Sequence, residues 1–103
     1  MSKAEPLEPA ARIEALTAIL SALSHPARRQ ILMTIWFRGG SMSSGDIDGR
    51  FRHSWPTTTR HLRVLEESAL VRKERQGRSR IYRLNLERLN LISEWLAWFD
   101  SAT

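Results

Sequence analysis

The sequence predicts a mainly helical fold that contains one small β-hairpin. Apolar residues recur every three or four positions along most of the chain, which is typical of amphipathic helices. Prolines and hydroxyl residues stand where several of these patterns begin, as they do at helix N-termini. Residues 70–84 instead alternate around a glycine, as the two strands of a hairpin do. The 103 residues suffice for one domain, which we expect over residues 9–100 after a flexible N-terminal arm at 1–8.

The composition indicates a folded and basic protein. Apolar residues make up 42% of the chain, too many for a disordered one. The net charge of +5 is unevenly distributed, because ten basic residues oppose three acids between Arg50 and Arg83, while the rest of the chain carries −2. A charge run that serves only solvation does not require this segregation. The basic centre therefore favours a polyanionic partner such as double-stranded DNA.

Several kinds of site are excluded or unexpected. The absence of cysteine excludes disulfides and thiolate metal ligands. No converging carboxylates, nucleophile–base pair or glycine-rich phosphate loop is evident, so we expect neither an enzyme nor a bound cofactor. No apolar run has the length of a membrane span, and no signal peptide opens the chain. A cytoplasmic protein without membrane insertion is therefore expected.

Two helices are expected first, over residues 9–23 and from Pro26 to the pair Gly39-Gly40. Proline suits the first helical position, and glycine is common just after a helix ends. The segment 24–26 separates the two helices, because a residue before proline avoids the helical region. Arg28 and Arg29 lie near the second start, where they form either a solvated face or phosphate contacts.

A helix-turn-helix is expected next. Ser43 and Asp46 form a capping box that opens a short third helix, with Ile47 and Phe51 on one side. Ser54 is the expected N-cap of a fourth helix. The inward stripe of this fourth helix consists of Thr58, Leu62 and Leu65. In proteins with this motif the second of the two helices enters the major groove of DNA.

The outward face of the fourth helix carries the candidate base-reading residues. Hydroxyls reach base edges and phosphates, and arginine forms two hydrogen bonds to guanine. These candidates are Trp55, Pro56, Thr57, Thr59 and Arg60. The hairpin that follows carries arginines around Gly77 and is either an ordinary charged hairpin or, as its place favours, a wing against DNA. Candidate contacts to phosphates are Arg28, Arg63, Arg75, Arg78, Ser79 and Arg80.

The last helix, expected over residues 87–99, is apolar around much of its circumference. Its main stripe is Leu89, Ile92, Leu96 and Phe99. A terminal helix of a monomer needs one apolar face, so the second face suggests contact with another copy of the chain. Close packing of this helix within a monomer is the alternative. The candidate dimer interface consists of Ile13, Leu16, Leu20, Leu91, Trp95, Trp98 and Phe99.

From about Leu20 to Phe99 the chain resembles the ArsR/SmtB family of bacterial winged helix-turn-helix repressors. The resemblance rests on LSHPARRQIL (23–32), SSGDIDGRF (43–51), SWPTTTRHLRVLEESALV (54–71) and RQGRSRIYRL (75–84). It implies a homodimer formed by the first and last helices, a helix-turn-helix and a wing. It also implies repression of the protein's own or a neighbouring promoter, and many members release DNA when they bind a metal ion.

The metal sites of the family do not carry over to this chain. One type uses two cysteines in the helix before the helix that reads the DNA, where this chain has the sequence SMSSGDIDGRF. Another uses Asp and His in the last helix, but residues 86–103 contain no histidine. The three histidines, His25, His53 and His61, lack the spacing of converging ligands. We therefore expect no metal.

Three positions differ from the family pattern. Trp55 stands where a polar base reader is common, and Thr58 stands where a branched apolar residue is usual. Ala69 replaces the glycine that usually ends the reader helix, which costs stability if the residue is left-handed.

The sequence as a whole predicts a dimeric, sequence-specific repressor that binds a palindromic operator. Its inducing signal would be a small organic molecule, a protein antagonist or none at all. The alternative is a protein-interaction module whose basic face or Trp-rich last helix binds an acidic or membrane-bound protein partner. The salt dependence of DNA binding separates these hypotheses.

Overall fold

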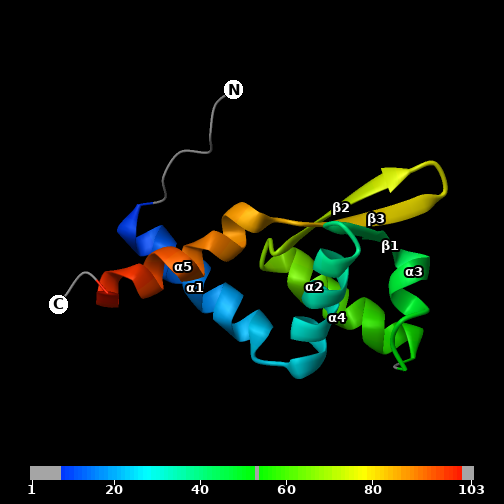
Figure 1. Cartoon of the computed structure of the whole chain (residues 1–103), viewed down its shortest axis with the longest axis horizontal. Helices are drawn as coiled ribbons and strands as arrows, with labels where there is room; N and C mark the ends of the chain where they lie inside the picture. The colour runs from blue at the N-terminus through cyan, green and yellow to red at the C-terminus, as the bar shows by residue number, and fades with distance from the viewer. Residues whose placement is uncertain (1–7, 53, 101–103) are drawn as a thin grey trace.

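The computed structural model describes residues 8–52 and 54–100. These residues form five helices and one small antiparallel sheet (Figure 1). The elements are α1 (Pro9–Leu23), α2 (Pro26–Phe37), β1 (Ser41–Ser43), α3 (Ser44–Asp48), α4 (Trp55–Glu67), β2 (Val71–Gln76), β3 (Ser79–Leu84) and α5 (Leu86–Asp100). The predicted fold class, mainly helical with a β-hairpin wing, is confirmed. Residues 1–7 of the predicted arm lie outside the described residues.

Side-chain caps begin α2, α3 and α4, and the caps at Ser43 and Ser54 are the predicted ones. The His25 imidazole accepts a hydrogen bond at 3.1 Å from the N–H of Ala27, which is the first N–H of α2 because Pro26 has none. The Ser43 hydroxyl accepts from the N–H of Asp46 at 3.1 Å, and the Ser54 hydroxyl accepts from the N–H of Thr57 at 3.4 Å. Each cap satisfies an N–H that has no partner inside its helix.

The sheet contains one strand that the sequence did not predict. β1 pairs with β3, and β3 pairs with β2 in the hairpin, so that Met42 lies opposite Tyr82. β1 has three residues, too few for an alternating pattern to reveal a strand. Burial raises the pKa of the Tyr82 phenol above its usual value, so the ring stays neutral where the sheet meets the helices.

The core lies between α1, α2, α4 and the sheet, and the inward stripe of α4 fills its centre. Thr58, Leu62 and Leu65 are all buried, as predicted. Thr58 places a hydroxyl at this apolar position, and its Oγ1 has no hydrogen-bond partner among the described residues. The remaining buried apolar residues include Ile19, Ile31, Ile35, Ile47, Leu70 and Val71.

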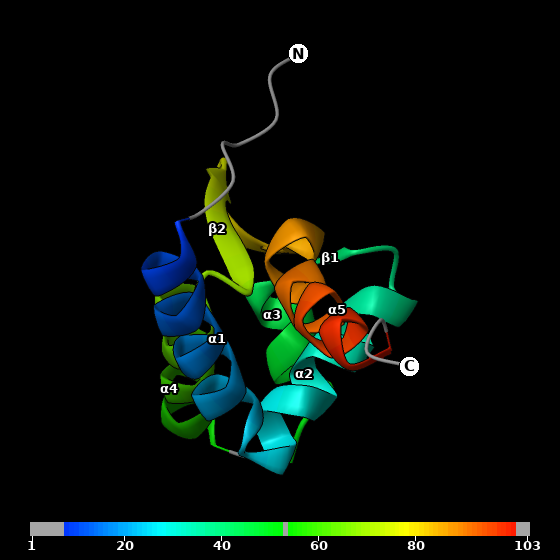
Figure 2. The ribbon, with the colours of Figure 1, turned by 90° about the vertical axis from the view of Figure 1, so that its left-hand side faces the viewer.

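Two predicted helices differ in extent or packing from the structure. α3 ends at Asp48, so Phe51 lies in the following loop and packs on the core from there. In α5 the early residues Leu89 and Ile92 pack on the core, but Leu96 and Phe99 are exposed. The alternative interpretation, a last helix packed closely within its own domain, does not fit this exposure, since no described residue of α5 is fully buried. α5 runs from the end of the sheet alongside α1, on the side of the molecule that faces the viewer in Figure 2.

Ala69 has the left-handed conformation that the sequence comparison with the family pattern suggested, with φ 63°. It ends α4, where its N–H donates to the Glu66 carbonyl at 3.0 Å and the N–H of Leu70 donates to the Leu65 carbonyl at 2.9 Å. An L-residue with a Cβ pays about 1–2 kcal/mol in this region, whereas glycine does not.

Replacing Ala69 by glycine is expected to raise the free energy of unfolding by about 0.5–1 kcal/mol, after the greater chain entropy of glycine is subtracted. Urea denaturation followed by circular dichroism measures the change. Ala18→Gly, at an exposed position inside α1, is the control and should lose about 1 kcal/mol. Equal destabilisation in both variants would contradict a left-handed Ala69.

Candidate nucleic-acid interface

The outward face of α4 exposes four of the predicted contact residues, Trp55, Pro56, Arg60 and Arg63. Arg60 and Arg63 lie one turn apart, so both project from the same side of the helix. Within the described part of the chain, neither guanidinium is paired with a carboxylate. This face therefore presents unneutralised positive charge beside an exposed aromatic ring.

The two threonines of the predicted base-reading set are less available. Thr57 is half-buried, and its hydroxyl lies 3.0 Å from the Ser54 hydroxyl at the helix cap. Thr59 is also half-buried, and its Oγ1 is enclosed with no hydrogen-bond partner in the described part of the chain. The rotation of the helix turns the Thr59 hydroxyl away from solvent, which argues against its predicted role in reading a base.

The wing keeps its predicted basic tip. All four predicted contact residues of the hairpin are exposed: Arg75, Arg78, Ser79 and Arg80. Gly77 forms the tip with φ 59°, and its carbonyl accepts a hydrogen bond from Arg75 Nε at 3.3 Å. The one acid of the hairpin, Glu74, pairs with Arg83. The guanidiniums at the tip are therefore not neutralised within the hairpin.

Arg28 has a structural position that argues against its predicted phosphate contact. Its Nε donates to the Ala22 carbonyl at 2.6 Å, and its Nη1 lies 3.4 Å from Nδ1 of His61 on α4. The His61 ring lies 4.5 Å, between centroids, from the ring of His25. The half-buried guanidinium thus joins the end of α1 to α4. The sequence could not decide between a solvated face and phosphate contacts, because no local pattern distinguishes Arg28 from Arg29.

Sequence reasoning did not assign Arg50 and Arg52, which lie in the loop between α3 and α4. Both are exposed, and with Arg29 they line an open hollow of about 770 Å³ between α2 and this loop. In the sequence, these two arginines counted only toward the positive charge of the region between Arg50 and Arg83. Their place beside the N-terminus of α4 depends on how the loop folds back on α2.

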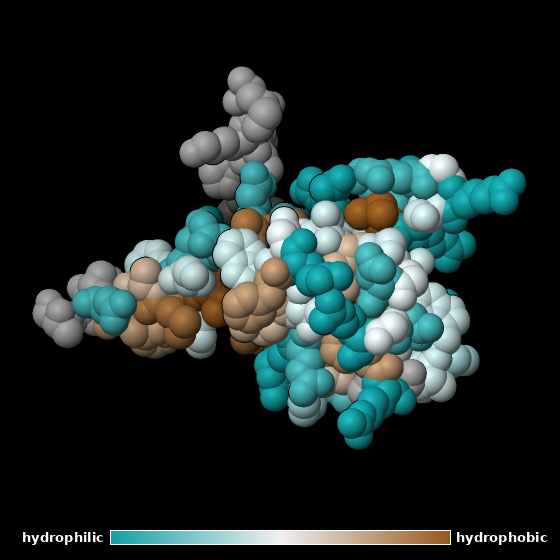
Figure 3. All heavy atoms as spheres, turned by 45° about the vertical axis from the view of Figure 1, so that its right-hand side comes forward, coloured by the Kyte–Doolittle hydropathy of each residue, from teal (hydrophilic) through white to brown (hydrophobic). Residues whose placement is uncertain are grey.

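The end of the molecule opposite the wing is apolar. Figure 3 shows hydrophobic residues gathered along α1 and α5, whereas hydrophilic residues cover the wing. Ile13 of α1 is 66% exposed and Trp98 of α5 is 69% exposed. The remaining exposed members of the predicted interface are Leu20, Trp95 and Phe99. Leu91 is half-buried, and Leu16 is only 8% exposed because it packs inward, which argues against an interface contact by that residue.

Metal and membrane sites were also sought over residues 8–52 and 54–100. In these ranges no three His, Cys, Asp or Glu side chains gather as the ligands of a metal ion would. His53 lies outside the described residues. No helix in the same ranges combines the length and apolar character needed to cross a membrane.

Comparison with known proteins identifies similar transcriptional repressors, although no family model matches the chain. The chain is 33% identical over 81 residues to the transcriptional repressor SdpR of Bacillus subtilis (strain 168), covering 79% of this chain and 88% of that protein. It is 33% identical over 79 residues to the arsenical resistance operon repressor of Staphylococcus xylosus, covering 77% of this chain and 74% of that protein.

Solved structures agree with these relatives. An ArsR family transcriptional regulator superposes with a TM-score of 0.77 at 28% identity, covering 95% of both chains. The transcriptional repressor BigR from Xylella fastidiosa superposes with a TM-score of 0.64 at 28% identity, covering 86% of this chain and 90% of that chain. All of these relatives are regulators of transcription rather than enzymes.

Proposed function

Since the chain belongs to the ArsR family of DNA-binding transcriptional regulators, we propose that it is a homodimeric, sequence-specific repressor of its own or a neighbouring promoter. One observation carries the proposal: α4 and the wing expose unneutralised arginines on a helix-turn-helix scaffold. A surface of this kind attracts the phosphate backbone of DNA and releases its counterions.

The residues divide into two roles in this proposal. Arg60 contacts a base in the major groove, with Trp55 and Pro56 against the sugar or a thymine methyl. Basic residues around them hold phosphates and set the position of α4: Arg50, Arg52, Arg63, Arg75, Arg78 and Arg80. Thr57 and Ser79 remain secondary candidates for contacts to bases and phosphates.

The exposed apolar end of α1 and α5 supports a homodimer. Trp95 and Phe99 stack edge to face with ring centroids 5.2 Å apart, and both are exposed, together with Ile13 and Trp98. Large exposed apolar patches mark interaction surfaces, and aromatic residues are enriched in them. A two-fold dimer through this end places two α4 helices on successive major grooves of a palindromic site, about 34 Å apart.

The chain contains no cysteine, so we propose that the repressor does not sense metal through thiolates. An organic molecule or a protein antagonist would release the DNA if it bound preferentially to the state of the dimer that binds DNA weakly.

A gel-shift titration tests the proposal. The DNA upstream of the coding region is compared with a scrambled duplex of equal length, at two salt concentrations. We expect tight binding that prefers the upstream DNA and weakens steeply with salt, because each released counterion adds to the slope. Equal and weak binding to both duplexes would leave only a basic surface, and would favour a protein partner at the wing or at α5.

A further inference from the structure

An apolar groove of about 430 Å³ runs between α2 and the segment where β3 joins α5. Its walls include Leu32, Met33 and Trp36 from α2, and Leu84 and Leu89 from the opposite side. Met33 is 53% exposed and Trp36 is 52% exposed, so water covers apolar surface that a ligand would bury. The groove is set apart from the reader face of α4, since no residue of α4 lines it.

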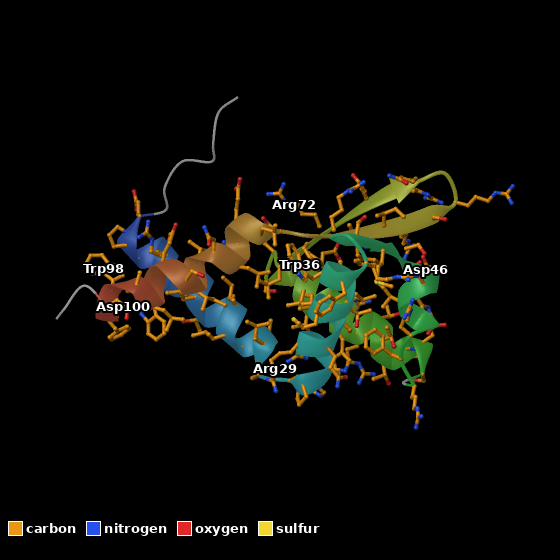
Figure 4. All side chains as sticks on the ribbon, viewed as in Figure 1. Arg29, Trp36, Asp46, Arg72, Trp98 and Asp100 are labelled. Atoms are coloured by element: carbon orange, nitrogen blue, oxygen red, sulfur yellow. The ribbon has the colours of Figure 1, made fainter. Side chains whose placement is uncertain are left out.

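Among the described residues, Arg29 is the only charged one that lines this groove. Its Nη1 donates a hydrogen bond of 2.6 Å to the carbonyl of Leu23, which lines the groove as well. Within the described residues no carboxylate pairs with this guanidinium. A guanidinium has five N–H donors, so one bond to a carbonyl leaves others for an acceptor. Figure 4 shows Arg29 towards the start of α2 and Trp36 towards its end, so the charge lies at one end of the groove.

We propose that this groove binds a small amphipathic carboxylate, with its apolar body along Leu32, Met33 and Trp36 and its carboxylate on Arg29. Arginine binds carboxylates through paired, charge-assisted hydrogen bonds, and it repels amines. Ligand sites are typically concave and apolar, hold a few placed polar groups and enclose about 300–1,000 Å³.

The site goes beyond the proposed function and does not depend on it. Its walls come from α2, which supports the helix-turn-helix, from the end of the wing strand β3, from α5 and from Leu23 at the end of α1. A bound carboxylate would therefore lie among residues of all four elements. Its binding is measurable without any DNA.

Isothermal titration of the full chain with decanoate, below its micelle concentration, tests the site. Decanol and decylamine are titrated beside it. We expect saturable binding of decanoate, weaker binding of decanol and the weakest binding of decylamine. Trp36 lines the groove, so intrinsic fluorescence should change with decanoate, and the change should shrink in Trp36→Phe while the heat of binding remains.

Two arginine variants give the matched comparison. Arg29→Ala should weaken decanoate binding about ten-fold or more, since a hydrogen bond to a charged group is lost, and should leave decanol unaffected. Arg38→Ala removes the same charge from an exposed position at the end of α2 outside the groove, and it should bind as the wild type does. Equal losses in both variants would mean attraction by the overall charge, and would overturn the proposal.

Met33→Glu supplies an independent variant, because it adds a carboxylate to an exposed wall of the groove. It should abolish decanoate binding by repulsion. Unchanged affinity in Met33→Glu would place the ligand elsewhere. Absence of decanoate binding by the wild type would also overturn the proposed site. This outcome includes the case in which a second copy of the chain covers the groove, which would shield Trp36 from quenching by acrylamide.

Discussion

Ile13→Glu is expected to convert the protein to monomers and to lower its affinity for the operator by at least about 100-fold. Ile13 is 66% exposed on α1, so the substitution leaves the core intact. In the proposed dimer the new carboxylate would be buried without a partner, which costs several kcal/mol. Loss of the dimer then removes the second half-site contact, and linked binding of this kind contributes about 10²–10⁴ in affinity.

Sedimentation velocity and gel shift measure the two parts of this result. Ala18→Glu is the matched control, because Ala18 is also exposed on α1 but lies about a third of a turn or more away around the helix. The control should remain dimeric and bind the operator normally. A dimeric Ile13→Glu protein would place the interface on another surface, and monomers with unchanged operator affinity would show that dimerisation does not contribute to DNA binding.

Arg60→Ala is expected to weaken binding to the operator by about 10- to 100-fold, which corresponds to about 1–3 kcal/mol for a base contact. Binding to a scrambled duplex should change much less. Arg60 is exposed on the reader face and forms no ion pair in the described part of the chain, so its removal costs little stability.

Arg78→Ala is the comparison for Arg60→Ala. Arg78 lies at the wing tip, where a phosphate contact is proposed. It should weaken binding to both duplexes alike and lower the salt slope by about one. Fluorescence anisotropy on both duplexes across a salt series separates the two variants. Equal losses on both duplexes for Arg60→Ala would remove Arg60 from the base-reading residues.

Local chemistry explains why much of the fold was predictable. The caps at Ser43 and Ser54 involve residues three apart, so the spacing alone specifies them. The buried stripe of α4 follows from helical periodicity, and the turn at Gly77 follows from its tolerance of positive φ. Ala69 was singled out instead by the family pattern, in which glycine usually ends this helix, and its φ of 63° agrees with that expectation.

Features that depend on distant contacts were not predictable in this way. β1 is a strand only because β3 lies beside Ser41–Ser43. Arg28 and Arg29 are adjacent in sequence, yet one joins α1 to α4 and the other lines an apolar groove. Sequence spacing gives both the same chemistry, and only the packing of α1 against α2 separates them.

The sequence by itself therefore determined the capped starts of α3 and α4, the inward face of α4, the basic wing and the class of partner, because each depends on spacing and charge within a short segment. The tertiary structure decided which of these side chains remain available. It enclosed the Thr59 hydroxyl, buried Leu16, and left Ile13 and Trp98 exposed at the end opposite the wing. Availability depends on what other segments cover, and that is a property of the packed chain rather than of any local pattern.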